Sequence, residues 1–315
     1  MNSFNQLDEQ LSFWGINLNK IYKDQFMKYY ELLIERNRVM NLTAITGWED
    51  VCTKHFLDSA ALCSNELQLD FTNKTLIDIG SGAGFPGIVL KILQPNLNVL
   101  LLDALTKRVS FLNDVLVNLQ LFQIQGQANL LDNTVPGRDS VNVSRETSQT
   151  ELNINTMMKN PFCVAVHGRA EELALGLNET QNILKKKQNQ QPTDQNLSKD
   201  KSGLLYSPEA VKGSGREQFD FVTARAVSDL RVLCEYALPL LKIGGFFCAY
   251  KTADIDYEVK SAKQGIALLG GEVSKIHRYS LPTTNILRSL VFIQKVKLTE
   301  PKYPRHNSII KKKPL

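Results

Sequence analysis

The feature that most constrains the fold is a glycine-rich run between two short apolar segments. Gly80-Ser81-Gly82-Ala83-Gly84-Phe85-Pro86-Gly87 follows the strand-like segment 76–79 and opens the helix-like segment 87–93. Glycines let the backbone turn sharply and let a ligand approach the main chain closely. We therefore expect a strand-turn-helix unit whose turn is a binding loop.

The same alternation along the chain predicts an α/β fold. Apolar runs typical of strands recur at 76–79, 99–102, 162–167, 219–223, 246–250, 273–279 and 289–295, and stretches typical of helices lie at 87–93, 107–119, 229–241 and 255–268. This order favours a Rossmann-like, mostly parallel seven-stranded sheet covered on both faces. Only residues 281–286 separate the last two strands, which indicates a C-terminal β-hairpin.

Three further regions surround this core. Residues 1–70 read as an N-terminal helical extension, residues 71–300 as the main domain, and residues 301–315 as a basic tail. Polar tracts near 123–160 and 177–217 interrupt the domain, and we expect disordered or loosely ordered insertions there. In the extension, Asn37 and Asn41 share a helix face, and we expect them to tie down the helix end by hydrogen bonds to the backbone.

Composition narrows the class of protein. With 43% hydrophobic residues the chain can form a core, but no apolar run is long enough for a membrane span. The first residues lack the pattern of a secretion signal, so we expect a cytoplasmic protein without a membrane partner. Five cysteines and four histidines show no metal-ligand spacing, so we expect no metal site. The net charge of +5 permits a polyanionic partner without requiring one.

The glycine spacing alone leaves two cofactor classes open. Gly82, Gly84 and Gly87 also match the dinucleotide pattern of NAD-dependent oxidoreductases. Asp103 ends the second strand, where it can accept hydrogen bonds from the ribose of either cofactor class. Phe85 favours methyl transfer, since its ring stands where a pyrophosphate needs clearance. Asp78 also favours methyl transfer, because its side chain can reach the amino acid part of a ligand directly or through water.

Six motifs then occur in a fixed order. They are Asn37-Arg38-Val39-Met40-Asn41-Leu42-Thr43, His55-Phe56-Leu57-Asp58-Ser59, the run from Asp78 to Gly87, Lys107-Arg108 before Phe111-Leu112, Gly168-Arg169-Ala170-Glu171-Glu172, and Ala224-Arg225-Ala226-Val227. Together they resemble the RsmG (also called GidB) methyltransferases, over nearly the whole chain except the polar insertions. The resemblance implies a class I methyltransferase that uses S-adenosyl-L-methionine to methylate ring nitrogen 7 of a guanine in bacterial 16S ribosomal RNA.

The resemblance also implies site residues. The expected cofactor-binding residues, together with Asp78 from the loop itself, are Gly80, Phe85, Asp103, Ala104, Leu105, Ala170, Glu171 and Arg225. Nitrogen 7 of guanine carries a free lone pair, so the reaction needs alignment more than a general base. Arg225, His55, Asp58 and Lys251 are therefore expected to position the reactants. Many relatives have glycine after this lysine, whereas Thr252 follows Lys251 here, which weakens its assignment.

The expected RNA-binding residues are basic and lie mostly near the carboxyl end: Arg169, Arg288, Arg305, Lys311, Lys312 and Lys313. The expected partner is 16S ribosomal RNA or the small ribosomal subunit, and we expect a monomer. Three alternatives remain open at this point: a methyltransferase acting on a protein or small molecule, an NAD-dependent oxidoreductase, and a non-catalytic RNA-binding protein. His55 and Asp58 also remain open between a helix-surface ion pair or cap and a substrate-side role.

Removing part of the second polar insertion tests its expected independence from the core. Deletion of residues 185–195, which include the basic triplet Lys185-Lys186-Lys187, is expected to leave the melting temperature nearly unchanged, because so polar a stretch buries little apolar surface. Thermal unfolding followed by circular dichroism measures this. A large drop would mean that the stretch packs against the fold.

Overall fold

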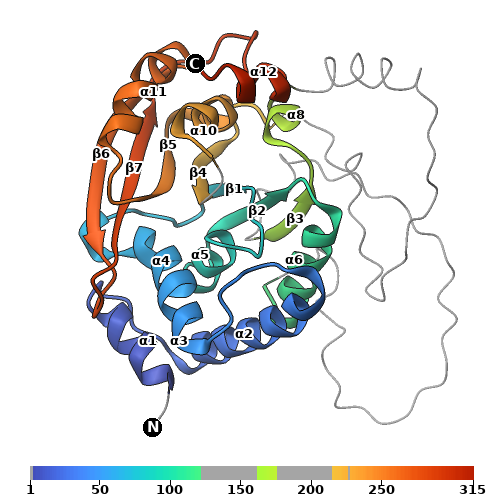
Figure 1. Cartoon of the computed structure of the whole chain (residues 1–315), viewed down its shortest axis with the longest axis vertical. Helices are drawn as coiled ribbons and strands as arrows, with labels where there is room; N and C mark the ends of the chain where they lie inside the picture. The colour runs from blue at the N-terminus through green and yellow to red at the C-terminus, as the bar shows by residue number, and fades with distance from the viewer. Residues whose placement is uncertain (1–2, 122–161, 176–214, 226–227) are drawn as a thin grey trace, which may run out of the picture.

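The computed structural model describes residues 3–121, 162–175, 215–225 and 228–315 (Figure 1). Both polar insertions lie outside these ranges, except that residues 215–217 at the end of the second one are described. There, Arg216 donates hydrogen bonds to the carbonyl oxygens of Thr299, Glu300 and Tyr303. These last residues therefore belong to the fold.

The predicted seven-stranded sheet is confirmed, in the order β3-β2-β1-β4-β5-β7-β6. The strands are β1 (Thr75–Ile79), β2 (Asn98–Asp103), β3 (Cys163–His167), β4 (Phe219–Arg225), β5 (Leu241–Thr252), β6 (Gly271–Ser280) and β7 (Leu287–Lys295). Strands β1 to β5 pair in parallel, and β7 runs antiparallel to both β5 and β6. The carboxyl ends of β1, β2, β3 and β4 therefore lie along one edge, where ligands collect in such sheets.

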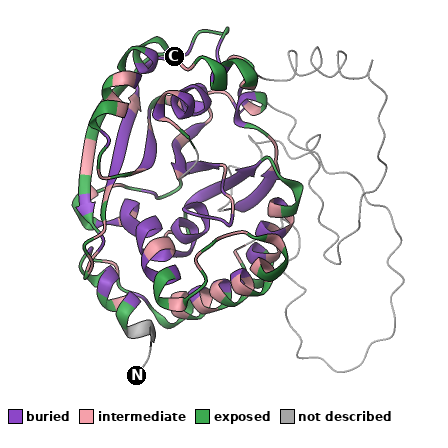
Figure 2. Ribbon diagram, viewed as in Figure 1, coloured by how far each residue is buried: buried purple, intermediate pink, exposed green. Residues whose placement is uncertain are grey.

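Helices cover both faces of the sheet (Figure 1). One face packs against α1 (Ser3–Ser12), α2 (Lys20–Met40), α3 (Trp48–Val51), α4 (Asp58–Ala60), α5 (Gly87–Leu93) and α6 (Thr106–Asn118). The other packs against α8 (Ala170–Leu175), α10 (Leu230–Ala237), α11 (Asp256–Leu268) and α12 (Asn307–Lys312). Figure 2 shows β1 and β2 buried along their whole length and the edge strand β6 partly exposed, as expected for a sheet covered on both faces.

The N-terminal extension packs on the sheet through a stripe of apolar residues. On α2, Phe26, Tyr29 and Leu33 recur at helical spacing and are completely buried. The helix ends as predicted: Asn41 adopts a left-handed conformation with φ of 48°, and the Asn37 side chain binds both backbone groups of Thr43. The extension is thus fixed to the domain and not a separate unit.

Three local features differ from the sequence-based expectation. The helical extension expected over residues 1–70 contains a π-helical segment (Cys52–Leu57), a rarer type of helix that often occurs at functional sites. The helix expected over 229–241 ends at Ala237, because Pro239 has no N–H to continue it. Strand β5 then begins at Leu241, five residues earlier than expected, and passes Gly244 with φ of 87°.

The basic tail is packed onto the domain. Arg305 forms an ion pair with Glu235, a fully buried residue of α10, through two hydrogen bonds of 2.8 and 2.6 Å. Tyr236 donates a hydrogen bond to Asn307, and Ile310 is completely buried. The Arg305 guanidinium therefore compensates a buried carboxylate within the fold, and the expectation that it also binds RNA stays a prediction.

Among the described residues, none of the helices is sufficiently long and apolar to cross a membrane.

Breaking the tail's ion pair should destabilise the fold. Arg305→Ala leaves Glu235 buried without a counter-charge, and we expect a loss of about 2–4 kcal/mol in the free energy of unfolding. Lys302→Ala is the matched control, because Lys302 pairs with Glu300 at 61% side-chain exposure, where water screens the ion pair and it contributes little to stability. Urea unfolding followed by tryptophan fluorescence compares the two. Equal effects would contradict the structural role of Arg305.

Candidate active site

The glycine-rich run forms the bend between β1 and α5. Gly80, Gly82 and Gly84 have φ of 68°, 60° and 100°, in the left-handed region that favours glycine. A Cβ on Gly84 would lie 2.5 Å from both Ile88 Cδ1 and Tyr29 Oη. Conformation and space therefore both require glycine here, and the predicted strand-turn-helix unit is confirmed.

Two carboxylates hold this bend from neighbouring strands. Asp78 Oδ2, on β1, accepts a hydrogen bond from Gly87 N at 3.1 Å. Asp103 Oδ2, at the end of β2, accepts one from Gly82 N at 2.9 Å, and its Oδ1 accepts one from Leu105 N at 2.9 Å. The bend is thus tied at both ends to the sheet.

Asp78 is buried and hydrogen-bonded within the fold. The residue is 0% exposed, and its second oxygen accepts a hydrogen bond of 3.0 Å from the Thr223 hydroxyl. Burial raises the pKa of the Asp78 carboxyl to about 6, although hydrogen bonds from Gly87 and Thr223 oppose the shift. We expected Asp78 to reach a ligand, directly or through water. Both carboxylate oxygens are hydrogen-bonded within the fold, and the ligand role of Asp78 stays a prediction.

Asp103 is the last residue of β2, at the edge where ligands collect in such sheets. It is 3% exposed, and Arg108 Nη1 lies 3.5 Å from its Oδ2. A carboxylate has about four lone-pair sites, so Asp103 keeps acceptor capacity beyond its backbone hydrogen bonds. After it come Ala104, whose carbonyl contacts His167 Nε2 at 3.1 Å, and Leu105, an apolar side chain that is 44% exposed.

Phe85 joins the bend to the N-terminal extension. Its ring is 6% exposed and stacks with Tyr29 at 5.2 Å and with His55 at 4.6 Å between centroids. The Tyr29 hydroxyl also donates a 2.5 Å hydrogen bond to Ala83 O, inside the bend. The Arg225 guanidinium carbon lies 5.0 Å from the Phe85 ring centroid, a cation–π distance. The extension is therefore one wall of the site.

Arg225, at the end of β4, contacts both His55 and Asp58. Its Nη1 donates to Asp58 Oδ2 and to Lys54 O, each at 3.1 Å, and its Nη2 lies 3.2 Å from His55 Nδ1. The side chain is only 12% exposed. His55 and Asp58 thus both face Arg225, and this favours their site role over an exposed ion pair on the helix surface.

The His55 ring is a neutral acceptor toward Arg225. A guanidinium can only donate, so His55 Nδ1 accepts and the proton lies on Nε2, which donates to Thr43 Oγ1 at 2.9 Å. The Lys54 carbonyl oxygen also lies 3.2 Å from Nδ1, but it already accepts a hydrogen bond from Arg225 and so does not require a proton on Nδ1. Burial, and then the charge of Arg225, lower the pKa of His55 to about 4. Asn37 and Thr43 belong to the first sequence motif and His55 to the second, so these hydrogen bonds connect the two motifs.

The remaining predicted residues are distributed around this edge. Lys251 Nζ donates to Glu258 at 2.6 Å and to Ser228 O at 2.7 Å, so its charge is compensated within the fold. Ala170 and Glu171 are buried at the start of α8, and burial raises the pKa of Glu171. Arg169, just before α8, is exposed.

Arg288 and the tail lysines lie on the surface or close to it. Arg288 Nε lies 3.5 Å from Asp58 Oδ1, with 28% of its side chain exposed. Lys311, Lys312 and Lys313 are exposed, on or next to α12. Within the described ranges, no three His, Cys, Asp or Glu residues form a group that could hold a metal ion.

Three residues of the site were not predicted from the sequence. Tyr29 and Tyr279 lie within apolar patterns that indicate only burial, yet their hydroxyls donate to Ala83 O and to Asp58 Oδ1. Thr223, in the middle of β4, donates to Asp78. A hydroxyl in an apolar run is the only signal that marked them, and it does not identify the acceptor.

Comparison with known proteins decides the family. The family model described as GidB, rRNA small subunit methyltransferase G, matches residues 22–193 and 208–287. The chain belongs to the GidB family. Its relatives include the ribosomal RNA small subunit methyltransferase G of Lachnoclostridium phytofermentans, 37% identical over 96% of this chain and 93% of that protein. Those of an Exiguobacterium species and of Staphylococcus epidermidis are each 35% identical, over 98% and 99% of this chain and 98% of each relative.

The part matched by the GidB model contains most of the site. It includes the bend, Asp103, His55, Asp58, Arg225 and Lys251. It stops at residue 287, so Arg288 and the packed basic tail lie just beyond it. The predicted family, and with it a methyltransferase of small-subunit ribosomal RNA, is confirmed.

The neutral state of His55 can be tested directly. Because its pKa of about 4 lies below the ordinary value of 6.5, the unfolded chain binds the proton more readily. This contribution to stability is therefore present above pH 6.5 and declines as the pH falls toward 4. NMR of the imidazole nitrogens should show the proton on Nε2 and a titration midpoint below 5. A midpoint near 6.5 would contradict the assigned contact with Arg225.

Proposed function

We propose that the protein transfers a methyl group from S-adenosyl-L-methionine to ring nitrogen 7 of a guanine in 16S ribosomal RNA. Membership of the GidB family supports a small-subunit ribosomal RNA substrate. The observation that carries the cofactor assignment is the bend with Asp103 beside it. The position of the methylated nitrogen rests on the resemblance of the sequence motifs.

The residues at the bend fit the proposed cofactor. A Cβ on Gly82 would meet only Gly80 O, at 3.8 Å, so the missing side chain leaves open space beside the loop. Asp103 offers acceptors for ribose hydroxyls, and the exposed Leu105 offers an apolar surface for a base. By resemblance, Ala104, Ala170 and Glu171 would complete the nucleoside side. When bound, the cofactor supplies an activated methyl group on a sulfonium sulfur.

The site supports alignment and not proton abstraction. Displacement at a methyl carbon needs an in-line approach, and nitrogen 7 of guanine carries no proton to remove. His55, the imidazole nearest the bend, has Nδ1 occupied by Arg225 and Nε2 by Thr43. Its lowered pKa makes it a poor base at neutral pH. Arg225, His55 and Asp58 would therefore orient the reactants.

Basic side chains on the surface would contact the RNA backbone. The candidates are Arg169, Arg288, Lys311, Lys312 and Lys313, and the tail lysines are carried on a helix anchored by the buried Ile310. Such contacts are sequence-blind and weaken with salt. We also propose that the protein acts as a monomer in the cytoplasm. Lys251 would act on the site by orienting Glu258, since its ammonium donates to Glu258 and to Ser228 O.

A methylation assay tests the proposed function. Wild-type protein is incubated with radiolabelled S-adenosyl-L-methionine and small ribosomal subunits from cells that lack this modification. Label is expected in 16S RNA, at one guanine that becomes sensitive to reductive cleavage specific for 7-methylguanosine. Label found only in ribosomal protein would overturn the RNA substrate, and label at another guanine atom would overturn nitrogen 7.

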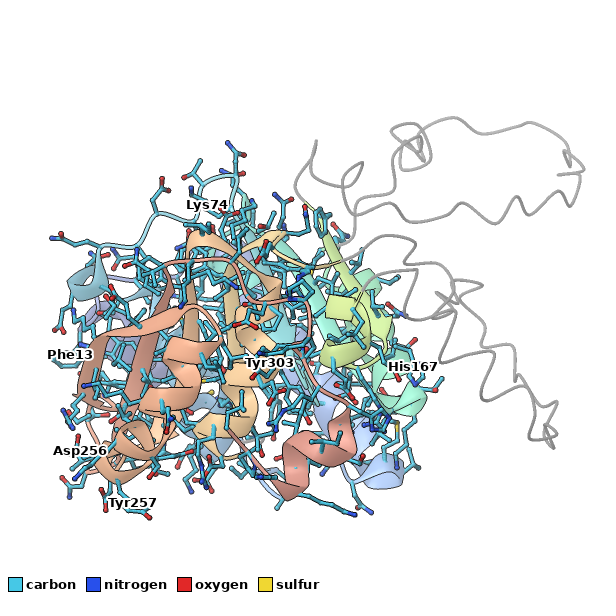
Figure 3. The ribbon with its side chains drawn as sticks, turned by 90° about the horizontal axis from the view of Figure 1, so that it is seen from above. Phe13, Lys74, His167, Asp256, Tyr257 and Tyr303 are labelled. Carbon is cyan, nitrogen blue, oxygen red and sulfur yellow. The ribbon has the colours of Figure 1, made fainter. Side chains whose placement is uncertain are left out.

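Removing the Asp103 carboxylate, which is proposed to bind the ribose, should weaken cofactor binding. Asp103→Ala is expected to reduce the binding free energy of S-adenosylhomocysteine by about 1–3 kcal/mol, because it removes acceptors for ribose hydroxyls. Asp256→Ala is the control, because its side chain is 74% exposed at the start of α11, at the periphery of the molecule (Figure 3). Isothermal titration calorimetry measures both. Unchanged affinity in Asp103→Ala would show that the pocket is misassigned.

A further inference from the structure

Asp58 is a buried carboxylate shared by three parts of the fold. It lies on α4 of the N-terminal extension and is 5% exposed. Its Oδ2 accepts from Arg225 at the end of β4. Its Oδ1 accepts from the Tyr279 hydroxyl on β6 at 3.2 Å and lies 3.5 Å from Arg288 Nε on β7. One side chain therefore joins the extension, the central sheet and the hairpin.

The charges in this cluster do not balance. Arg225 and Arg288 each carry a positive charge, and His55 is neutral because burial and Arg225 lower its pKa to about 4. Among the described residues, Asp58 is the one carboxylate that forms an ion pair with either arginine. The cluster therefore carries one net positive charge, and it would carry two without the carboxylate.

The excess charge matters because the site must accept a cation. Arg225 lies over Phe85, which belongs to the bend proposed to bind the cofactor. A methyl donor of the sulfonium class carries a positive charge on sulfur, whereas its demethylated product is a neutral thioether. Charges in a buried setting are poorly screened, so an added positive charge acts over several ångströms. It would penalise the donor and leave the product unaffected.

We propose that Asp58 is a positioning residue that fixes Arg225 over the bend and lowers the local positive charge, so that a sulfonium donor is penalised less than it would be without this carboxylate. This inference rests on the proposed function and adds a specificity determinant to it. The same compensation would favour a target base that becomes cationic when it is methylated.

The test compares the affinities of the full-length protein for S-adenosyl-L-methionine and S-adenosylhomocysteine by isothermal titration calorimetry. Asp58→Asn keeps the size of the side chain and removes its charge. In this variant the affinity for the donor should fall by a factor on the order of three- to tenfold larger than the affinity for the product. Tyr279→Phe is the matched structural control. It removes a buried hydrogen bond to the same carboxylate without changing any charge, so the ratio of the two affinities should stay at the wild-type value.

Arg288→Gln should change the ratio of the two affinities in the opposite direction. It also keeps the inference testable if the Asp58→Asn protein does not fold. It removes one positive charge from a side chain that is 28% exposed, and it should shift the ratio toward the donor. Parallel losses for both ligands in Asp58→Asn, or an unchanged ratio in Arg288→Gln, would overturn the inference while leaving the proposed function intact. If the wild-type protein bound neither ligand, the proposed function would fail as well.

Discussion

The site depends on two acids that hold one bend of the backbone. Asp78 is the next-to-last residue of β1 and Asp103 the last residue of the neighbouring parallel strand β2, and each accepts a hydrogen bond from a main-chain N–H of the glycine-rich loop. A loop with glycines at positive φ has little intrinsic preference for one conformation, so these hydrogen bonds and the packing of Tyr29 against it define its shape. The two acids differ in environment. Asp78 is sealed in the core, while Asp103 lies beside the open space at Gly82 and keeps acceptor capacity for a ligand.

A second constraint makes the N-terminal extension part of the active site. The extension contributes Tyr29, His55 and Asp58, which contact the bend or Arg225. Hydrogen bonds connect its two motifs: the Asn37 side chain binds the backbone of Thr43, and the Thr43 hydroxyl accepts a hydrogen bond from His55. The extension and the catalytic domain therefore share one core, and a change at the end of α2 can reach the cofactor loop through these contacts.

Much of this arrangement could be predicted from the sequence, for identifiable reasons. Strand and helix periodicity, the glycine spacing and the short 281–286 connection predicted the sheet, the bend and the hairpin, because local patterns encode them. The partners of buried polar groups could not be predicted in the same way. Nothing local indicates that Tyr279 donates to Asp58 across 221 positions, or that Arg305 pairs with Glu235 across 70. The burial of Asp78 could not be predicted for the same reason, because it depends on how β1, β4 and α5 pack.

The most direct test of the central claim is a crystal structure of the protein with S-adenosylhomocysteine. The account predicts the ligand at the bend between β1 and α5, with its ribose hydroxyls within hydrogen-bond distance of the Asp103 carboxylate. Density for the ligand elsewhere, with the bend unchanged and empty, would contradict it.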